Sequence, residues 1–161
     1  GNTIDEARAV ARGLTPLDAD PDALASALQT LVKRVQQGSG TECVLETQGD
    51  VRVSDSATAS HLYRIAQEAL ANVVKHAHAR KISVLLQGKG NKLLLQVEDD
   101  GVGLPENNDG KGMGLRIMSY RALLIGGNLT VTNRDEGGTR VLCQVRRDAA
   151  PPSTQNAGSK S

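Results

Sequence analysis

The sequence contains no phenylalanine and no tryptophan, and Tyr63 and Tyr120 are its only tyrosines. Its hydrophobic core must therefore be built mainly from leucine, valine, isoleucine and alanine. No apolar run approaches the roughly 20 residues that a membrane-spanning helix needs, and we expect no signal peptide. These absences favour a soluble globular domain with an aliphatic core.

Charge of one sign and cysteine are also scarce. The 19 Lys and Arg residues nearly balance the 18 Asp and Glu residues, which leaves a net charge of +1 and no electrostatic case for binding nucleic acid or an anionic membrane. Cys43 and Cys143 lie far apart within alternating apolar segments. We interpret them as buried free thiols in a reducing compartment, with a disulfide or a metal site as the alternative.

Glycine is plentiful and concentrated around one stretch, Leu95–Leu115. An apolar run ends there in Asp99 and Asp100, and the glycines that follow are Gly101, Gly103, Gly110, Gly112 and Gly114. Glycine lets the backbone approach a ligand closely, so two glycine clusters around a short polar loop indicate a nucleotide pocket with a lid. The motif GxxxxGK[ST] is absent, and the first glycine pair does not open a helix, which excludes a P-loop and a Rossmann site.

Hydrophobic periodicity predicts an alternation of helices with strand hairpins. The expected helices are Ile4–Arg12, a segment from an Asp20 cap to Gly38 or Gly40, Ala57–Ala79 and Leu115–Ile125. The expected strands are Thr41–Thr47, a short piece at Val51–Val53, Lys81–Gln87, Lys92–Glu98, Asn128–Asn133 and Thr139–Arg146. This order predicts an α+β two-layer sandwich, in which helices pack on one face of a mixed β-sheet.

The longest predicted helix carries a row of polar residues on its otherwise apolar face. Glu68, Asn72, Lys75 and His76 follow helical spacing, so their side chains can point the same way. An amide oxygen such as that of Asn72 can bind Mg²⁺, whose remaining ligands are usually water and phosphate oxygens. Asp99, at the end of a buried strand, can accept a hydrogen bond from an amino group such as that of adenine.

Four segments, in this order, resemble the sequence boxes of sensor histidine kinases. Gln67–Asn72 with Lys75–Ala77 resembles the N-box, Asp99–Pro105 the first glycine box, Gly110–Leu115 the second, and Gly137–Thr139 the last short box. The lead-in His61–Ala69 and the short lid are similar to the subfamily that includes the nitrate/nitrite sensors. The resemblance covers roughly residues 11 to 147 and implies a Bergerat ATP-binding fold, shared with gyrase, MutL and the large heat-shock chaperone.

The resemblance also implies a role for each matching residue, with ATP and Mg²⁺ as ligands. Asn72 would hold Mg²⁺, Asp99 would bind the adenine amine, and Glu68 occupies the catalytic base position of hydrolysing relatives. The implied nucleotide-binding residues are Asn72, Lys75, His76, Asp99, Gly101, Gly103, Lys111, Gly112, Met113, Gly114, Leu115 and Thr139. Structural alternatives remain for several of them: Glu68 could pair with Lys75 or Arg64, Lys111 could be solvated, and Met113 could be a packing residue at the base of the lid.

The family's phosphoacceptor histidine is missing, because none of His61, His76 and His78 has an acidic neighbour. We therefore expect residues 1–13 to be the end of an upstream helical dimerisation domain, 14–147 the ATP-binding catalytic domain and 148–161 a disordered tail. The implied partners are that dimerisation domain, with the parent protein a homodimer and this fragment a monomer, and a response regulator. The expected location is cytoplasmic, and the parent could be anchored in a membrane. The alternatives are an ATPase or serine kinase of the same superfamily, and a non-catalytic pseudokinase module.

Overall fold

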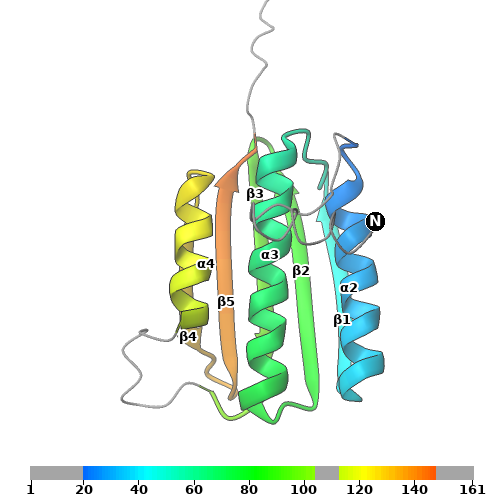
Figure 1. Cartoon of the computed structure of the whole chain (residues 1–161), viewed down its shortest axis with the longest axis vertical. Helices are drawn as coiled ribbons and strands as arrows, with labels where there is room; N and C mark the ends of the chain where they lie inside the picture. Colours follow the sequence, from blue (N-terminus) through cyan, green and yellow to red (C-terminus); the bar gives the residue numbers. More distant parts are fainter. Residues whose placement is uncertain (1–19, 104–112, 148–161) are drawn as a thin grey trace, which may run out of the picture.

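A computed structural model of the 161-residue chain describes residues 20–103 and 113–147. Five strands form one sheet in the order β1-β2-β3-β5-β4, and α2, α3 and α4 cover one of its faces (Figure 1). The elements are α2 (Ala23–Ser39), β1 (Glu42–Gly49), α3 (Ser56–Asn72), the π-helical turn η1 (Val73–Ala77), β2 (Lys81–Lys89), β3 (Lys92–Asp99), α4 (Met113–Leu124), β4 (Asn128–Asn133) and β5 (Thr139–Arg146). The predicted α+β sandwich with helices on one face of a mixed sheet is confirmed.

The sheet is mixed because of how its strands are connected. β1 and β2 are parallel, since α3 crosses over between them, and the other neighbouring pairs are antiparallel. The register aligns Leu86 with Leu95, and Leu95 with Cys143, so that apolar residues of adjacent strands lie on the helix-covered face.

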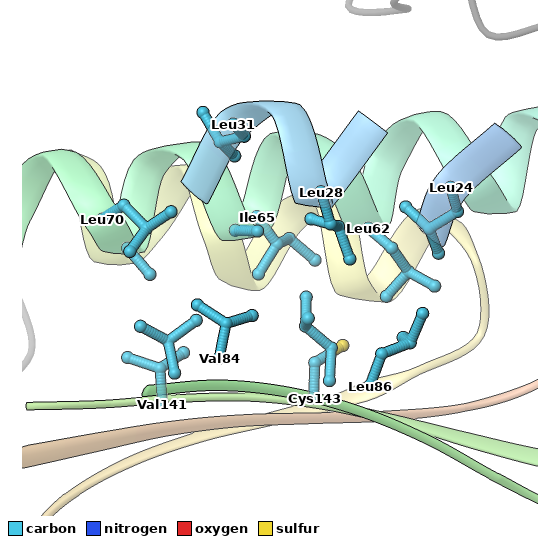
Figure 2. Close-up of a cluster of buried hydrophobic side chains, with 14 of the residues drawn as sticks. Leu24, Leu28, Leu31, Leu62, Ile65, Leu70, Val84, Leu86, Val141 and Cys143 are labelled. Carbon is cyan, nitrogen blue, oxygen red and sulfur yellow. The ribbon is translucent and has the colours of Figure 1, made fainter. Parts of the chain in front are cut away.

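The core lies between the helices and this face of the sheet (Figure 2). Its largest fully buried side chains are Leu24, Leu28, Leu62, Ile65, Leu70, Ile82, Leu86, Leu93, Leu95, Met118, Val84 and Val97. Each buried leucine or isoleucine contributes roughly 2 kcal/mol of transfer free energy. Cys43 and Cys143 are buried free thiols, as predicted, and burial raises their pKa values to about 11 and about 12.

The N-terminal half differs from the sequence prediction at the start of α2, in β1, which spans Glu42–Gly49 instead of Thr41–Thr47, and at Val51–Val53. Helix α2 begins at Ala23, after a turn in which Asp20 accepts a hydrogen bond from the Asp22 amide, and Pro21 is therefore outside the helix. The segment Val51–Val53 is not a strand; its Val53 amide donates to the Pro21 carbonyl at 2.9 Å and ties the connection to the start of α2. The predicted helix Ile4–Arg12 lies outside the described residues.

The predicted helix Ala57–Ala79 is regular only as far as Asn72. Asp55 caps its start by accepting hydrogen bonds from the Ala57 amide (3.3 Å) and the Thr58 hydroxyl (2.6 Å). After Asn72 the chain forms the π-helical turn η1 and ends with His78 in the left-handed region, at φ 52°. Single π-helical turns are rare and often occur at functional sites.

The C-terminal elements follow the prediction closely. β4 and β5 have the predicted bounds, and α4 extends over Met113–Leu124 instead of Leu115–Ile125. β2 and β3 continue to a tighter turn than predicted, because Lys89 pairs with Lys92 and leaves only Gly90 and Asn91 between them. Among the described residues, none of the helices has the length and apolar character needed to cross a membrane.

Candidate functional site

Four segments that are distant in sequence meet at one end of the sheet, the lower end in Figure 1. They are the end of α3, the end of β3, the start of α4 and the turn between β4 and β5. The strand directions cause this convergence, since β3 runs toward this end and the β4–β5 hairpin turns there. The site residues predicted from separate sequence boxes belong to these segments.

Glu68 and Asn72 lie one helical turn apart on α3 and face the first turn of α4. Gly114 is the reason that α4 can approach them: a Cβ there would lie 2.5 Å from Glu68 Oε2 and 2.9 Å from Asn72 Nδ2. The predicted polar row thus holds for these two residues, and it meets a helix N-terminus, where free amides and the helix dipole favour anions. A carboxylate and an amide are thereby placed beside a potential phosphate-binding helix end.

Asp99 is held from two sides at the end of β3. The residue is only 2% exposed, and its carboxylate accepts a hydrogen bond from the Gly101 amide at 2.8 Å and another from the Thr139 amide. The backbone of Gly138 packs so closely against the Asp99 carbonyl that a Cβ at Gly138 would overlap the carbonyl oxygen. The first glycine box and the last short box therefore enclose the same carboxylate.

The adjacent acids Asp99 and Asp100 have opposite electrostatic environments. Burial raises the pKa of Asp99, and the amides of Gly101 and Thr139 offset only part of that effect. The Asp100 carboxylate instead accepts hydrogen bonds from the Lys81 (3.1 Å) and Arg80 (2.8 Å) amides, which lower its pKa. The Asp100 carboxylate therefore caps backbone amides at the start of β2, whereas Asp99 is a buried carboxylate at the candidate site.

Arg134 was not predicted as a site residue, yet it contacts the end of β3. Its Nη1 donates to the Asp99 carbonyl at 2.8 Å, and its side chain is 19% exposed. The sequence placed Arg134 directly before the last glycine turn, but only the pairing of β3 with β5 brings that turn beside Asp99. Arg134 could therefore be identified as a site residue only from the tertiary structure, and not from the residues around it in the sequence.

The remaining predicted residues are distributed around this end. Gly103 adopts φ +81° beside the Asn133 side chain, which requires glycine there. Lys75 and His76 are exposed on η1, whose wider turn changes the spacing of the predicted row. Leu115 is half-buried in α4, and Met113 begins that helix. Lys111 and Gly112 lie outside the described residues.

The contact between α3 and α4 continues as a polar seam away from the site. Arg121 on α4 lies 3.2 Å (Nη1 to Nδ1) from His61 on α3, and Arg64 Nη1 donates to Gln67 at 2.9 Å. Burial and the Arg121 charge lower the pKa of His61. The Arg121–His61 contact joins α4 to α3, whereas the Arg64–Gln67 hydrogen bond lies within α3.

Comparison with known proteins agrees with this geometry. Residues 57–149 match the family model described as histidine kinase-, DNA gyrase B- and HSP90-like ATPase. The match spans all four converging segments, from α3 to the β4–β5 hairpin. The chain belongs to this ATPase family.

The curated relatives are sensor histidine kinases. The chain is 31% identical over 144 residues to the oxygen sensor histidine kinase NreB of Staphylococcus carnosus, covering 88% of this chain and 42% of the relative. It is 33% identical over 138 residues to the signal transduction histidine-protein kinase/phosphatase UhpB of Salmonella typhimurium, covering 85% and 27%. The chain thus spans less than half the length of these relatives.

Solved structures support the same assignment. The histidine kinase domain of the blue-light activated kinase from Erythrobacter litoralis EL346 has a TM-score of 0.63 at 25% identity, covering 83% of this chain and 66% of that one. The ATP-binding domain of PrrB from Mycobacterium tuberculosis has a TM-score of 0.61 at 20% identity and covers 76% and 95%, which shows the shared fold. Within this ATPase family, the chain resembles the ATP-binding domain of sensor histidine kinases, as the sequence boxes indicated.

Proposed function

We propose that this domain binds ATP at the end of the sheet where α3, α4, β3 and the β4–β5 turn meet, and transfers its γ-phosphoryl group to a histidine of a separate dimerisation domain. The observation that carries the proposal is the pairing of two subsites at this end. Asp99 is a buried acceptor suited to an amine, and Glu68 with Asn72 lies against the α4 N-terminus, suited to phosphates.

Asp99 is the proposed contact for the adenine amine. The Gly101 and Thr139 amides use acceptor capacity on its carboxylate but leave further lone pairs, because an ionised carboxylate has about four acceptor sites. An amine that donates to this buried carboxylate replaces the hydrogen bonds that the carboxylate lost with its water. The carbonyl oxygen that guanine has in place of the adenine amine carries partial negative charge, and the carboxylate would repel it. The pocket is therefore expected to prefer adenine to guanine nucleotides.

Asn72 is the proposed Mg²⁺ ligand, because its amide oxygen is of the hard oxygen type that Mg²⁺ prefers and it lies beside the α4 N-terminus. When bound, Mg²⁺ neutralises charge on the phosphates. Lys75 and His76 are exposed on η1 and would add positive charge toward the same groups. Lys111, Gly112, Met113, Gly114 and Leu115 are proposed to complete the phosphate side, while Gly101, Gly103 and Thr139 shape the adenine side.

The proposed reaction breaks the bond between the γ-phosphorus and its bridging oxygen and forms a bond from that phosphorus to an imidazole nitrogen. Glu68 would orient the incoming imidazole or accept its proton. Residues 14–147 are the proposed catalytic domain, and 1–13 the end of the dimerisation domain that carries the acceptor. A response regulator would receive the phosphoryl group. Because the reaction uses cellular ATP, the proposal places the domain in the cytoplasm.

Calorimetric titration with a non-hydrolysable ATP analogue and Mg²⁺ tests the binding step. The unsubstituted chain is expected to bind in the micromolar range, and Asp99→Asn to lose at least about 100-fold in affinity, because an amide hydrogen would face the purine amine. Asp100→Asn is the matched control: the neighbouring acid caps a turn and should bind normally. Equal binding by all three proteins would refute the adenine role of Asp99.

Phosphotransfer is tested by adding a dimerisation domain with its histidine in trans. Acid-labile, base-stable labelling of that domain is the expected result, and Glu68→Gln should slow it without abolishing nucleotide binding. Fast ATP hydrolysis without an acceptor would favour an ATPase instead. Nucleotide binding with neither hydrolysis nor transfer, even with the domain present, would favour a pseudokinase.

A further inference from the structure

We propose that Arg134 is a positioning residue of the nucleotide site, which holds the end of β3 and keeps the Asp99 carboxylate ready to accept the purine amine. This inference deepens the proposed function and rests on it. Arg134 does not belong to any of the four sequence boxes; its place in the site follows from the fold alone.

The first argument is the contact itself. Arg134 Nη1 donates to the Asp99 carbonyl at 2.8 Å, on the residue whose side chain the amine would meet. The backbone of Arg134 is fixed as well, since its amide donates to the Gly138 carbonyl at 2.9 Å and its carbonyl accepts from the Gly137 amide at 3.1 Å. The guanidinium is therefore anchored to a closed turn and can hold β3 in place.

The second argument is charge. The groups that act on the Asp99 carboxylate are the amides of Gly101 and Thr139, the carboxylate of Asp100 and the guanidinium of Arg134. Burial and Asp100 favour the protonated form, whereas Arg134 and the two amides favour the ionised form. Arg134 supplies the positive side chain in this set, and an amine donor needs the ionised form.

The third argument is that Arg134 is not fully used by the protein. Its Nε is buried and has no hydrogen-bond partner among the described residues, and its ion pair with Glu136 is long (3.7 Å) and involves a carboxylate that is 73% exposed. An arginine whose role was only to hold the turn would be expected to satisfy its buried donors. Arg64 Nε is also buried without a partner among the described residues, so it is the position of Arg134 beside Asp99 that gives its charge a role in the site.

The test compares two nucleotides on matched variants. Affinities of a non-hydrolysable ATP analogue and of inosine triphosphate, which lacks the amine, are measured by calorimetry for the unsubstituted chain and for Arg134→Gln, Arg134→Lys and Asp99→Asn. Arg140→Gln is the control, since Arg140 belongs to the same hairpin but pairs with Glu98 instead of Asp99. Thermal unfolding of each variant reports the fold.

Arg134→Gln should bind the ATP analogue about tenfold more weakly at pH of about 8, while its affinity for inosine triphosphate changes less than about twofold. The loss should grow as the pH is lowered, because Asp99 protonates more readily without the guanidinium. Arg134→Lys should restore part of the affinity, and Arg140→Gln should behave as the unsubstituted chain.

The outcomes separate the two proposals. Equal loss for both nucleotides, or no loss with either, would overturn the role of Arg134 while Asp99→Asn still abolished selective binding. Absence of binding by the unsubstituted chain, or normal binding by Asp99→Asn, would overturn the adenine pocket itself and the role of Arg134 with it.

Discussion

The two ends of the sheet are each organised by one arginine, and the two arginines are used differently. At the end opposite the candidate site, Arg147 donates to the carbonyls of Asp50, Arg52 (3.2 Å) and Gly90 (2.7 Å), and its amide donates to the Asn91 carbonyl. Two separate connections, the one between β1 and α3 and the β2–β3 turn, are thereby tied to the end of β5. At the site end, Arg134 donates to the Asp99 carbonyl, and its buried Nε has no hydrogen-bond partner within residues 20–103 and 113–147.

The acids at the two ends differ in the same way. Asp50 pairs with Arg52 at 2.9 Å, and this pairing lowers its pKa, whereas burial raises the pKa of Asp99. Near Asp50, the charged groups pair with each other and with backbone carbonyls, whereas near Asp99 the described part of the chain has a desolvated carboxylate and a donor without a partner. Functional sites often contain groups that lower the stability of the folded protein and that the protein itself does not compensate. The difference indicates that the Arg147 end stabilises the fold and that the Asp99 end is adapted to a ligand.

The largest expected effect is a difference in stability between alanine substitutions at two glycines with positive φ, one at each end of the sheet. Gly138→Ala should destabilise the domain by about 3 kcal/mol or more, because its Cβ would overlap the Asp99 backbone. Gly90→Ala, at φ +61° with open space around it, should cost only about 1 kcal/mol. Urea unfolding monitored by circular dichroism measures both. Similar losses would mean that the close approach at Gly138 carries little energy.

Removal of the Arg147 side chain should affect stability and leave the site intact. Arg147→Ala should cost about 2–3 kcal/mol, because three carbonyls lose a charged donor. Arg146→Ala, at the exposed neighbouring position, should change stability by less than about 0.5 kcal/mol. Nucleotide affinity of the folded Arg147→Ala protein should be unchanged in calorimetry. A clear loss of affinity would show that the two ends are coupled.

Gly114→Ala should have the opposite effect to Arg147→Ala: it should weaken nucleotide binding and leave stability nearly unchanged. The added Cβ would displace the flexible ends of the Glu68 and Asn72 side chains and not backbone, so stability should change by less than about 1 kcal/mol. Affinity for the ATP analogue should fall about tenfold, because the Glu68 and Asn72 side chains would be displaced from the phosphate side of the site. Gly38→Ala, within α2 and with no neighbour within 4 Å, is the control and should stabilise by about 0.5–1 kcal/mol.

Periodicity and turn chemistry predicted most of the fold. The bounds of β4 and β5 were correct, because alternating residues flank a Gly-Gly turn. Leucines at helical spacing in α2, namely Leu24, Leu28 and Leu31, are all buried in the core. The π-helical turn η1 was missed because Ala57–Ala79 has an unbroken helical pattern. Nothing local in that pattern signals where the wider turn begins.

The site was predicted box by box, but its internal contacts were not. The sequence assigned Asp99, Gly101 and Thr139 to one pocket through a family resemblance, and the structure brings the three together. Arg134 was missed because its partner, the Asp99 carbonyl, is 35 residues away in the chain. Contacts of this kind depend on which strands become neighbours, and the order β3-β5-β4 cannot be derived from hydrophobic periodicity.

The smallest expected effect compares the pH dependence contributed by Asp50 and Asp99. The lowered pKa of Asp50 means that its contribution to stability is complete above its unfolded pKa of about 4 and is lost as pH falls through its folded value. The raised pKa of Asp99 has the opposite sign: its contribution is complete below about pH 4 and is lost as pH rises through its folded value.

Melting temperatures of the unsubstituted chain, Asp50→Asn and Asp99→Asn, measured without nucleotide from about pH 3 to about pH 7, resolve the two contributions. The advantage of the unsubstituted chain over Asp50→Asn should grow with pH, and its advantage over Asp99→Asn should shrink. Because Asp50 is exposed, added salt should flatten the first trend and leave the second nearly unchanged. If the two trends were parallel, the burial of the ionised Asp99 carboxylate would already be offset by groups of the protein. The candidate site would then contain no destabilised carboxylate that a bound ligand could stabilise.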